Sequence, residues 1–427
     1  MTTDKFTPYT SLLHEEVVPA IGCTEPIAVA LCATKAREIL GEIPLKIKLS
    51  LSANIYKNAM GVGIPNTGMT GLPIAVAMGI VCGESQFELE VLKNATEANV
   101  IEAKSYLDNH TIEIGIEKND CDVLYINCIV SGKESEAECT IKGSHTHFVF
   151  IRKDHTIIHK EELEHHETGG NKFNIESLRH VYDYAMNVEI KEIEFLQQSA
   201  DMNMQAAEFS FRGEYGHSLG KILKTQSPNS IFGNTLFTKI LSYTSGACDA
   251  RMSGALIPVM SNSGSGNQGI SATIPVVLFG KAHNISREKM LRALALSHLT
   301  VIYLKQHLGR LSALCGCVVA ATGSSCAITY LMGGDFEKIS FAVKNMAANI
   351  TGMICDGAKP SCSLKVTSGV ATAVLSATLA MNGSHATKFE GIVDEDVDRC
   401  IQNMTDIGRN AMHETDNKIL QIMTSKV

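Results

Sequence analysis

The chain of 427 residues contains no tryptophan, and only 6% of its residues are aromatic. Membrane proteins gather Trp and Tyr where their spans meet the lipid headgroups, so this shortage argues against a membrane protein. The sequence also lacks a run of Lys and Arg, and its net charge is −8. Because binding to nucleic-acid phosphates requires clustered positive charge, these features argue against a nucleic-acid partner.

An apolar signal segment and the common nucleotide-binding patterns are also missing. Residues 1–18, MTTDKFTPYTSLLHEEVV, carry acidic side chains where a secretory signal would be apolar. We therefore expect a cytoplasmic protein, in which the 13 cysteines stay reduced and form no disulfide framework. Neither a G-x-x-x-x-G-K-[ST] loop nor a strand–GxGxxG–helix unit occurs.

The composition divides the chain into two halves. Residues 44–160 read as strands, beginning with Leu45, Ile47, Leu49 and Leu51, which alternate with polar residues. Further strand patterns cover residues 110–117, 121–130, 136–143 and 147–151. Charged or Gly-containing turns separate them, so we predict a meander of antiparallel strands. The polar, Gly-containing segment 163–172 predicts a linker.

The second half reads as helical. Leu178, Tyr182, Ala185 and Met186 share one face of a helix, and residues 246–383 are rich in small side chains that suit closely packed helices. We predict an α+β fold with an N-terminal antiparallel sheet and a mostly helical second part. The predicted domains are residues 1–170, which include a helix carrying Cys23, and residues 171–427.

One alternative is a membrane transporter for a small amino acid. Residues 311–334 are uncharged for long enough to cross a bilayer, and the interrupted apolar segment 257–277 resembles the broken helices of transporters. These segments are richer in Ser, Thr and Gly than in large apolar residues. Their composition favours a soluble protein.

Three cysteines have the spacing of a metal-cluster site. Cys355 and Cys362 flank Gly357 and Pro360, which predict a loop, and Cys315 lies forty residues before Cys355. Structural zinc sites use close C-x2–4-C pairs, which these spacings do not match. Three thiolates suit a [4Fe–4S] cluster with one open iron that acts as a Lewis acid. The spacing alone leaves open that these are core cysteines beside a turn.

Cys23 directly precedes an expected helix. Pro26 suits a first helical turn, and the apolar residues that follow keep a helical spacing. The positive end of a helix dipole stabilises a thiolate, so the sequence predicts a lowered thiol pKa and a role for Cys23 as general base. The alternative is an inert thiol in a turn.

Three Gly-containing loops are candidate receptors for a substrate carboxylate. Backbone N–H groups with small hydroxyl and amide side chains bind carboxylates well. The candidate residues are Asn66 and Thr67 in segment 57–73, Ser144 and His145 in segment 143–146, and Ser263, Ser265 and Asn267 in segment 261–269.

Several of these segments together resemble one family. The phrases IGCTEPIAVALCATKA, NIYKNAMGVGIPNTGMTGLPIAVAMG, GSHTHFVF, NSGSGNQGISATIPVV and MICDGAKPSCSLKV are similar to the iron–sulfur L-cysteine desulfidases, which belong to the wider group of iron–sulfur L-serine dehydratases. The resemblance runs from about residue 10 to about residue 420, and the helical half corresponds to the α-chain of the dehydratases.

The resemblance implies a reaction and a set of residues. It implies cleavage of L-cysteine to hydrogen sulfide, pyruvate and ammonia without pyridoxal phosphate. Cys315, Cys355 and Cys362 match the cluster ligands, Cys23 matches the proton acceptor, and the GSHT phrase implies substrate contacts. Cys317, two residues after Cys315, is an alternative ligand, although the forty-residue separation favours Cys315.

We therefore predict a [4Fe–4S]-dependent lyase acting on L-cysteine, cytoplasmic and assembled as a homo-oligomer. The alternatives are an L-serine dehydratase, the transporter above, a non-catalytic cluster protein that senses iron or oxygen, and a lyase that uses pyridoxal phosphate. The last requires a Lys that forms a Schiff base, and no Lys lies in a context typical of that role.

Overall fold

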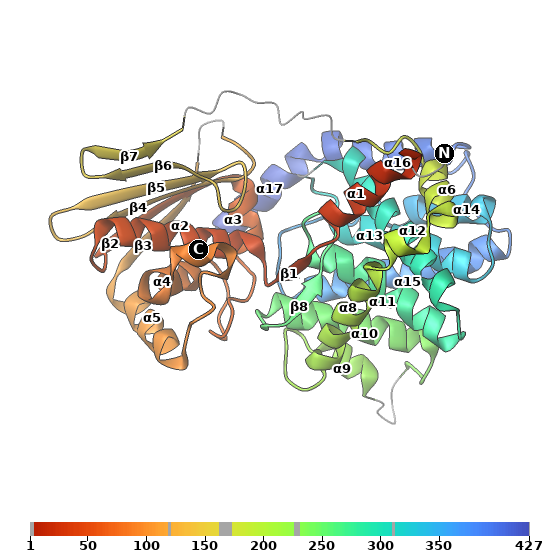
Figure 1. Cartoon of the computed structure of the whole chain (residues 1–427), viewed down its shortest axis with the longest axis horizontal. Coiled ribbons are helices and arrows are strands. Elements are labelled where there is room, and N and C mark those ends of the chain that lie inside the picture. The colour runs from red at the N-terminus through yellow and green to blue at the C-terminus, as the bar shows by residue number, and fades with distance from the viewer. Residues whose placement is uncertain (1–3, 118–120, 162–172, 226–230, 310–311, 427) are drawn as a thin grey trace.

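The computed structural model describes residues 4–117, 121–161, 173–225, 231–309 and 312–426 (Figure 1). The helices are α1 (Thr7–Glu16), α2 (Thr24–Leu40), α3 (Ala53–Ala59), α4 (Leu72–Cys82), α5 (Glu97–Asn109), α6 (Leu178–Asn187), α7 (Ile190–Ile193), α8 (Leu196–Ser210), α9 (Leu219–Lys224), α10 (Leu236–Met252), α11 (Gly266–Ala282), α12 (Arg287–Leu308), α13 (Gly316–Leu331), α14 (Phe336–Ile350), α15 (Cys362–Met381), α16 (Val397–Asp406) and α17 (His413–Thr424). Short helical segments are η1 (Asp4–Phe6), η2 (Ser85–Glu90) and η3 (Ile407–Ala411).

The strands form one large and one small sheet. They are β1 (Pro19–Ile21), β2 (Lys46–Leu51), β3 (Thr111–Ile116), β4 (Tyr125–Ser131), β5 (Glu136–Lys142), β6 (Phe148–Lys153), β7 (Thr156–Lys160) and β8 (Pro258–Met260). The six-stranded sheet has the order β3-β2-β4-β5-β6-β7, and β1 pairs with β8. The predicted α+β fold, with an N-terminal sheet followed by a helical region, is confirmed.

The predicted antiparallel meander is confirmed for β4 to β7, whereas the prediction is wrong for β3. Strand β3 lies parallel to β2, with Leu49 opposite Ile114. Parallel neighbours need a long crossover, and here the crossover contains the helices α3, α4 and α5. The expectation of strands throughout residues 44–160 is therefore also wrong. Helix α4 is apolar on almost every side, so its sequence carries no helical period.

Helix α2 covers one face of the large sheet. It contacts β4 and β5, and the sheet residues Leu49, Cys128 and Val130 are buried. The Cys32 thiol on α2 donates a hydrogen bond to the carbonyl of Cys139 at 3.3 Å. These cysteines act as small core residues.

The helical region packs around α13. This helix contacts α11, α12, α14 and α15, and its residues are almost all buried. A Cβ on Gly323 would lie 2.5 Å from the carbonyl oxygen of Ser297, so the close contact with α12 requires glycine. The uncharged segment at 311–334 is thus mainly a core helix. Among the described residues, only α15 is long and apolar enough to cross a membrane, by length and composition alone.

Each terminal helix packs against elements from the other half of the chain (Figure 1). Helix α1 packs against α12, whereas α17 contacts α3 near the sheet. Each region has its own hydrophobic core; Leu13 belongs to the helical one and Leu420 to the sheet one. The predicted boundary near residue 170 and the linker at 163–172 lie outside the described residues, so the domain division stays a prediction.

Candidate active site

A cavity of about 200 Å³ collects most of the predicted functional residues. It is lined from both regions of the molecule by Cys23, Glu25, Asn54, Lys57, Asn58, Arg251, Ser263, Gly264, Ser265, Asn267, Gln268, Lys305, Ser312, Leu314, Cys315, Gly316, Cys317, Cys355, Gly357, Ala358 and Cys362. The predicted base, the three predicted cluster ligands and the residues of the 261–269 loop therefore lie together.

Four helices begin at this cavity. Cys23, Ser265 and Cys315 are the N-cap residues of α2, α11 and α13, and Cys362 is the first residue of α15. A helix N-terminus carries partial positive charge and unpaired N–H groups, which favour a bound anion. The convergence of four such ends makes the cavity suitable for thiolates and for an anionic ligand.

Backbone pairing brings Cys315 and Cys355 together. Leu314 and Ile354 form an antiparallel bridge, with the N–H of Cys315 donating to Met353 at 2.9 Å and the N–H of Cys355 donating to Ala313 at 2.6 Å. Cys315 and Cys355 are diagonal neighbours across this bridge, so their side chains point to the same face. Residues forty positions apart are thereby held at one site.

The loop from Cys355 to Cys362 depends on Gly357. This residue has φ +91°, and a Cβ on it would lie 2.0 Å from the carbonyl oxygen of Lys57 in α3. The close approach lets the loop pack against α3 and return Cys362 to the cavity. The Cys362 thiol points back into the loop and contacts the carbonyl of Gly357 at 3.6 Å.

The thiols of Cys315 and Cys317 differ sharply in their protonation. A hydrogen bond from Cys317 lowers the pKa of Cys315 to about 7, although burial opposes the shift. The same bond and burial raise the pKa of Cys317. The hydrogen bond therefore favours the thiolate at Cys315, with Cys317 as the donor. This polarity favours Cys315 over Cys317 as the metal ligand.

Cys23 has the opposite electrostatics from those its sequence predicts. It is 6% exposed, and its thiol donates a hydrogen bond to Glu25 Oε2 at 3.0 Å. Burial raises the pKa of Cys23, and the negative charge of Glu25 adds to the effect, whereas Arg251 opposes it. The predicted lowering of this pKa is wrong, because burial disfavours the charged thiolate.

The 261–267 loop is held by a buried histidine. Asn262 Nδ2 lies 2.9 Å from His298 Nδ1, while His298 Nε2 lies 3.1 Å from Ser199 Oγ. Burial lowers the pKa of His298 to about 3, so the ring is neutral, accepts from Asn262 and donates through Nε2. Arg251 Nη1 donates to Asn267 Oδ1 at 3.2 Å. These contacts place Ser263, Ser265 and Asn267 on the cavity wall.

Four predicted substrate residues do not line the cavity. Thr67 holds its own turn, because its hydroxyl donates to Ile64 at 2.9 Å and accepts from the N–H of Met69 at 3.0 Å. Asn66 is exposed in the left-handed conformation at φ 62°. Ser144 and His145 lie in the turn between β5 and β6.

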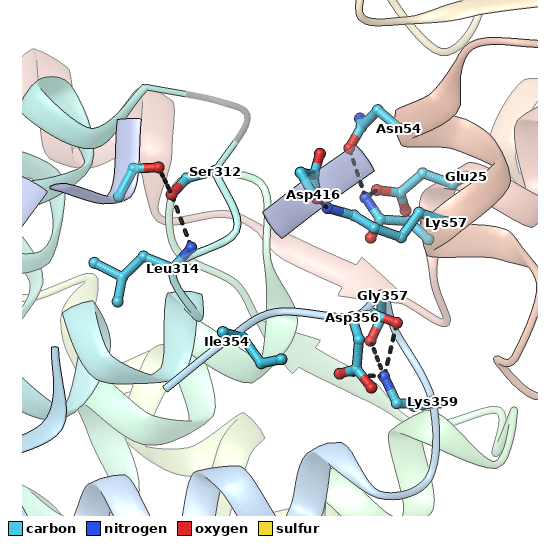
Figure 2. A network of polar contacts seen from close by, with 12 residues as sticks. Glu25, Asn54, Lys57, Ser312, Leu314, Ile354, Asp356, Gly357, Lys359 and Asp416 are labelled. Carbon is cyan, nitrogen blue, oxygen red and sulfur yellow. Dashed lines mark hydrogen bonds and ion pairs between the residues drawn. The ribbon is translucent and has the colours of Figure 1, made fainter. Parts of the chain in front are cut away.

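Sequence reasoning missed several polar residues of the cavity. Lys57 is 3% exposed and forms an ion pair of 2.5 Å with Asp416 on α17, near Glu25 and Asn54 (Figure 2). Arg251 and Gln268 are each 6% exposed and retain buried polar atoms without a partner. Glu25, Lys57 and Gln268 had a signal, since they lie in the quoted phrases that contain GCTEP, NIYKNAM and NSGSGNQG, whereas Arg251 lies outside them.

The three cysteines of the cavity are candidate ligands for an iron–sulfur cluster. Among the described residues, no three His, Cys, Asp or Glu side chains come close enough to hold one metal ion. In a four-iron cluster each thiolate binds a different iron, so the ligands surround a larger volume. Cys315, Cys355 and Cys362 line one cavity as free thiols, and Cys315 already favours the thiolate. This donor set fits an iron–sulfur cluster.

A cavity with this donor set suits a lyase of the serine dehydratase type. The family described as serine dehydratase alpha chain matches residues 86–421, and the chain belongs to this family of iron–sulfur serine dehydratases.

Relatives match over nearly the full chain. A UPF0597 protein of Bacteroides fragilis is 56% identical over 427 residues, which is 100% of both chains. A UPF0597 protein of Porphyromonas gingivalis is 49% identical over 97% of this chain and 98% of its own. One of Shewanella pealeana is 44% identical over 97% of each chain.

Proposed function

We propose that this protein is a cytoplasmic [4Fe–4S]-dependent lyase that cleaves L-cysteine to hydrogen sulfide, pyruvate and ammonia. The observation that carries the proposal is the shared cavity, where Cys315, Cys355 and Cys362 lie with Cys23 among four helix N-termini. A homo-oligomer remains our expectation, to be tested by light scattering.

Three cysteines would hold the cluster. Cys315 and Cys355 come from the paired segments and Cys362 from the start of α15. The N-terminal ends of α13 and α15 stabilise the negative charge of the thiolates. When bound, the cluster supplies a Lewis-acidic iron that favours departure of the β-substituent.

The other walls would bind and deprotonate the amino acid. The substrate carboxylate lies against the N-terminus of α11, where Ser263, Ser265 and Asn267 supply donors and Arg251 supplies positive charge. Cys23 takes the α-proton, and the pair of electrons left behind forms the double bond as the β-substituent leaves. The released enamine hydrolyses to pyruvate and ammonia.

L-Serine is the second candidate substrate, and the family description favours it. The two amino acids differ by one atom, and the choice depends on the leaving group. A thiolate is a softer ligand and a better leaving group than hydroxide, because a thiol has a pKa of about 8.5. This chemistry favours cysteine.

The test is product release by protein purified and reconstituted without oxygen, with L-cysteine and L-serine assayed in parallel. We expect equal amounts of sulfide and pyruvate from cysteine, lost in the Cys362→Ala variant and kept in Cys326→Ala, whose cysteine is fully buried in α13 away from the cavity. Pyruvate from serine alone would make the protein a dehydratase. An intact cluster without product from either would favour the sensor.

A further inference from the structure

The proposed role of Cys23 requires a place for its thiol proton. Cys23 is 6% exposed, and the Sγ donates to Glu25 Oε2 at 3.0 Å. A thiol is a poor base, and the thiolate is the form that accepts a proton. Cys23 can therefore take an α-proton only after its own proton has moved, and the carboxylate of Glu25 is in contact with it.

Glu25 is oriented by its neighbours. Thr24 Oγ1 donates to Glu25 Oε2 at 3.2 Å, and Asn58 Nδ2 on α3 donates to Oε1 at 3.4 Å. Asn58 also donates to Asn54 Oδ1 at 3.0 Å, one turn earlier on α3. A proton-accepting group beside an activated side chain, itself held by a third group, is a recurring catalytic arrangement.

We propose that Glu25 accepts the thiol proton of Cys23, so that the two residues form one acid–base unit at the start of α2. The proposal rests on the lyase reaction above. The Sγ–H bond breaks as an Oε2–H bond forms, and the thiolate then takes the substrate's α-proton. The electron pair of the Cα–H bond forms the Cα=Cβ bond, and sulfide leaves as HS⁻ with the pair from the Cβ–S bond. Glu25, which is partly exposed, releases its proton to solvent.

The charge of Arg251 assists this transfer, whereas the charge of ionised Glu25 favours the protonated thiol. When the proton moves to Glu25, the negative charge moves to Cys23 Sγ, near Arg251. The Arg251 guanidinium is anchored beside Cys23, because its Nη2 donates to the carbonyl of Gly22 at 3.0 Å. A fixed positive group in a buried setting stabilises the thiolate more than water-exposed charge would.

The test measures alkylation of Cys23 by iodoacetamide in the reconstituted holoenzyme, with peptide mass spectrometry as the readout. The charge of Glu25 raises the pKa of Cys23. We nevertheless expect the Glu25→Gln variant to react at least about tenfold more slowly at neutral pH than the unsubstituted protein, because an amide cannot take the thiol proton as Sγ attacks the reagent. Glu25→Asp keeps the carboxylate one methylene farther away and should react at an intermediate rate. If Glu25 acted through its charge alone, Glu25→Gln would form the thiolate more easily and react faster.

Two controls complete the design. Alkylation of Cys326, which is fully buried in α13, reports unfolding of a variant. If Glu25→Gln unfolds, the alkylation rate of Glu25→Asp is compared with that of the unsubstituted protein instead. A Glu25→Asp rate equal to or above the rate of the unsubstituted protein overturns the proposal. Equal rates for Gln and Glu, including no reaction in both, also overturn it. Alkylation needs no turnover, so a failure to cleave cysteine would contradict the proposed function separately.

Discussion

At the scale of single residues, the cavity holds thiols with opposite properties. The pKa of Cys315 is lowered to about 7 by the hydrogen bond from Cys317, whereas burial and Glu25 raise the pKa of Cys23. Both cysteines are N-cap residues of helices. The shared position at a helix start therefore does not explain the difference: the hydrogen bond from Cys317 lowers the pKa of Cys315, whereas burial first and Glu25 second raise that of Cys23.

This difference predicts distinct roles for Cys315 and Cys317. We expect Cys315→Ala to abolish cluster assembly. Cys317→Ala should keep the cluster but hold it about tenfold more weakly, as is typical for loss of a group that supports a metal ligand. Iron and acid-labile sulfide contents after anaerobic reconstitution, followed by a chelator challenge, measure both effects. Retention of the cluster in Cys315→Ala with its loss in Cys317→Ala would reverse the assignment.

The buried His298 predicts a pH-dependent stability. Burial lowers its pKa from 6.5 to about 3, so the folded protein keeps the ring neutral while the unfolded chain binds a proton below about pH 6.5. Stability from this residue is therefore complete above pH 6.5 and is lost as the pH falls toward 3. Between about pH 7 and about pH 5 the loss should be about 2 kcal/mol.

Denaturant unfolding at the two pH values checks this. His298→Gln should show a smaller loss of stability on acidification than the unsubstituted protein, and His155→Gln, at an exposed turn, should show the full loss. An equal loss in His298→Gln would mean that other groups cause the acid sensitivity.

At the scale of elements, the segment from Cys355 to Cys362 depends on a single conformation. Gly357→Ala introduces a Cβ at φ +91° and 2.0 Å from the Lys57 carbonyl oxygen, so we expect a cost of about 2 kcal/mol or more and loss of the cluster. Gly352→Ala is the matched control, since its Cβ would meet no atom within 4 Å. Thermal unfolding and iron content measure the outcome. Normal iron binding in Gly357→Ala would show that the loop tolerates displacement from α3.

Some of the helices and strands could be predicted from local sequence patterns, and others could not. Alternation in β2 and turn residues between β4, β5 and β6 predict those strands, because one face of each strand is buried and the other is more exposed. The helix after Cys23 follows from Pro26 and the spacing of apolar residues. Helix α4 escapes prediction because it is buried nearly all round, and the parallel pairing of β3 depends on this missed crossover.

The candidate site was predictable only where its residues lie in recognisable sequence segments. Cys23, Cys355 and Cys362 lie in phrases that resemble a family, and the cavity holds them together with Cys315. Arg251 lies outside these phrases, and no local pattern shows that Lys57 and Gln268 become neighbours of the cysteines when distant helices pack. The protonation of Cys23 depends on burial, which the local sequence does not reveal.

At the scale of the whole molecule, the C-terminal helix joins the two regions. Helix α17 contacts α3, and the ion pair of Lys57 and Asp416 links it to the cavity (Figure 2). The Lys57 side chain is 4% exposed and that of Asp416 is 27% exposed. Removal of one partner leaves a buried charge uncompensated, which is costly.

Asp416→Asn should therefore destabilise the fold by about 1–3 kcal/mol, less than a fully buried pair because Asp416 retains contact with water. Proteolysis within residues 413–424 should accelerate at the same time. Thermal unfolding and limited proteolysis measure these effects, with Glu414→Gln, exposed on the same helix, as the control. A variant as stable and as resistant as the control would show that α17 is held by apolar contacts alone.

We propose that three cysteines from two distant segments hold one cluster in this cavity and leave one iron open to substrate. Mössbauer spectroscopy of protein reconstituted with ⁵⁷Fe tests this most directly. We expect one iron in four with distinct parameters, which change when L-cysteine is added under anaerobic conditions. Four irons that stay unchanged on addition of the amino acid would contradict the claim.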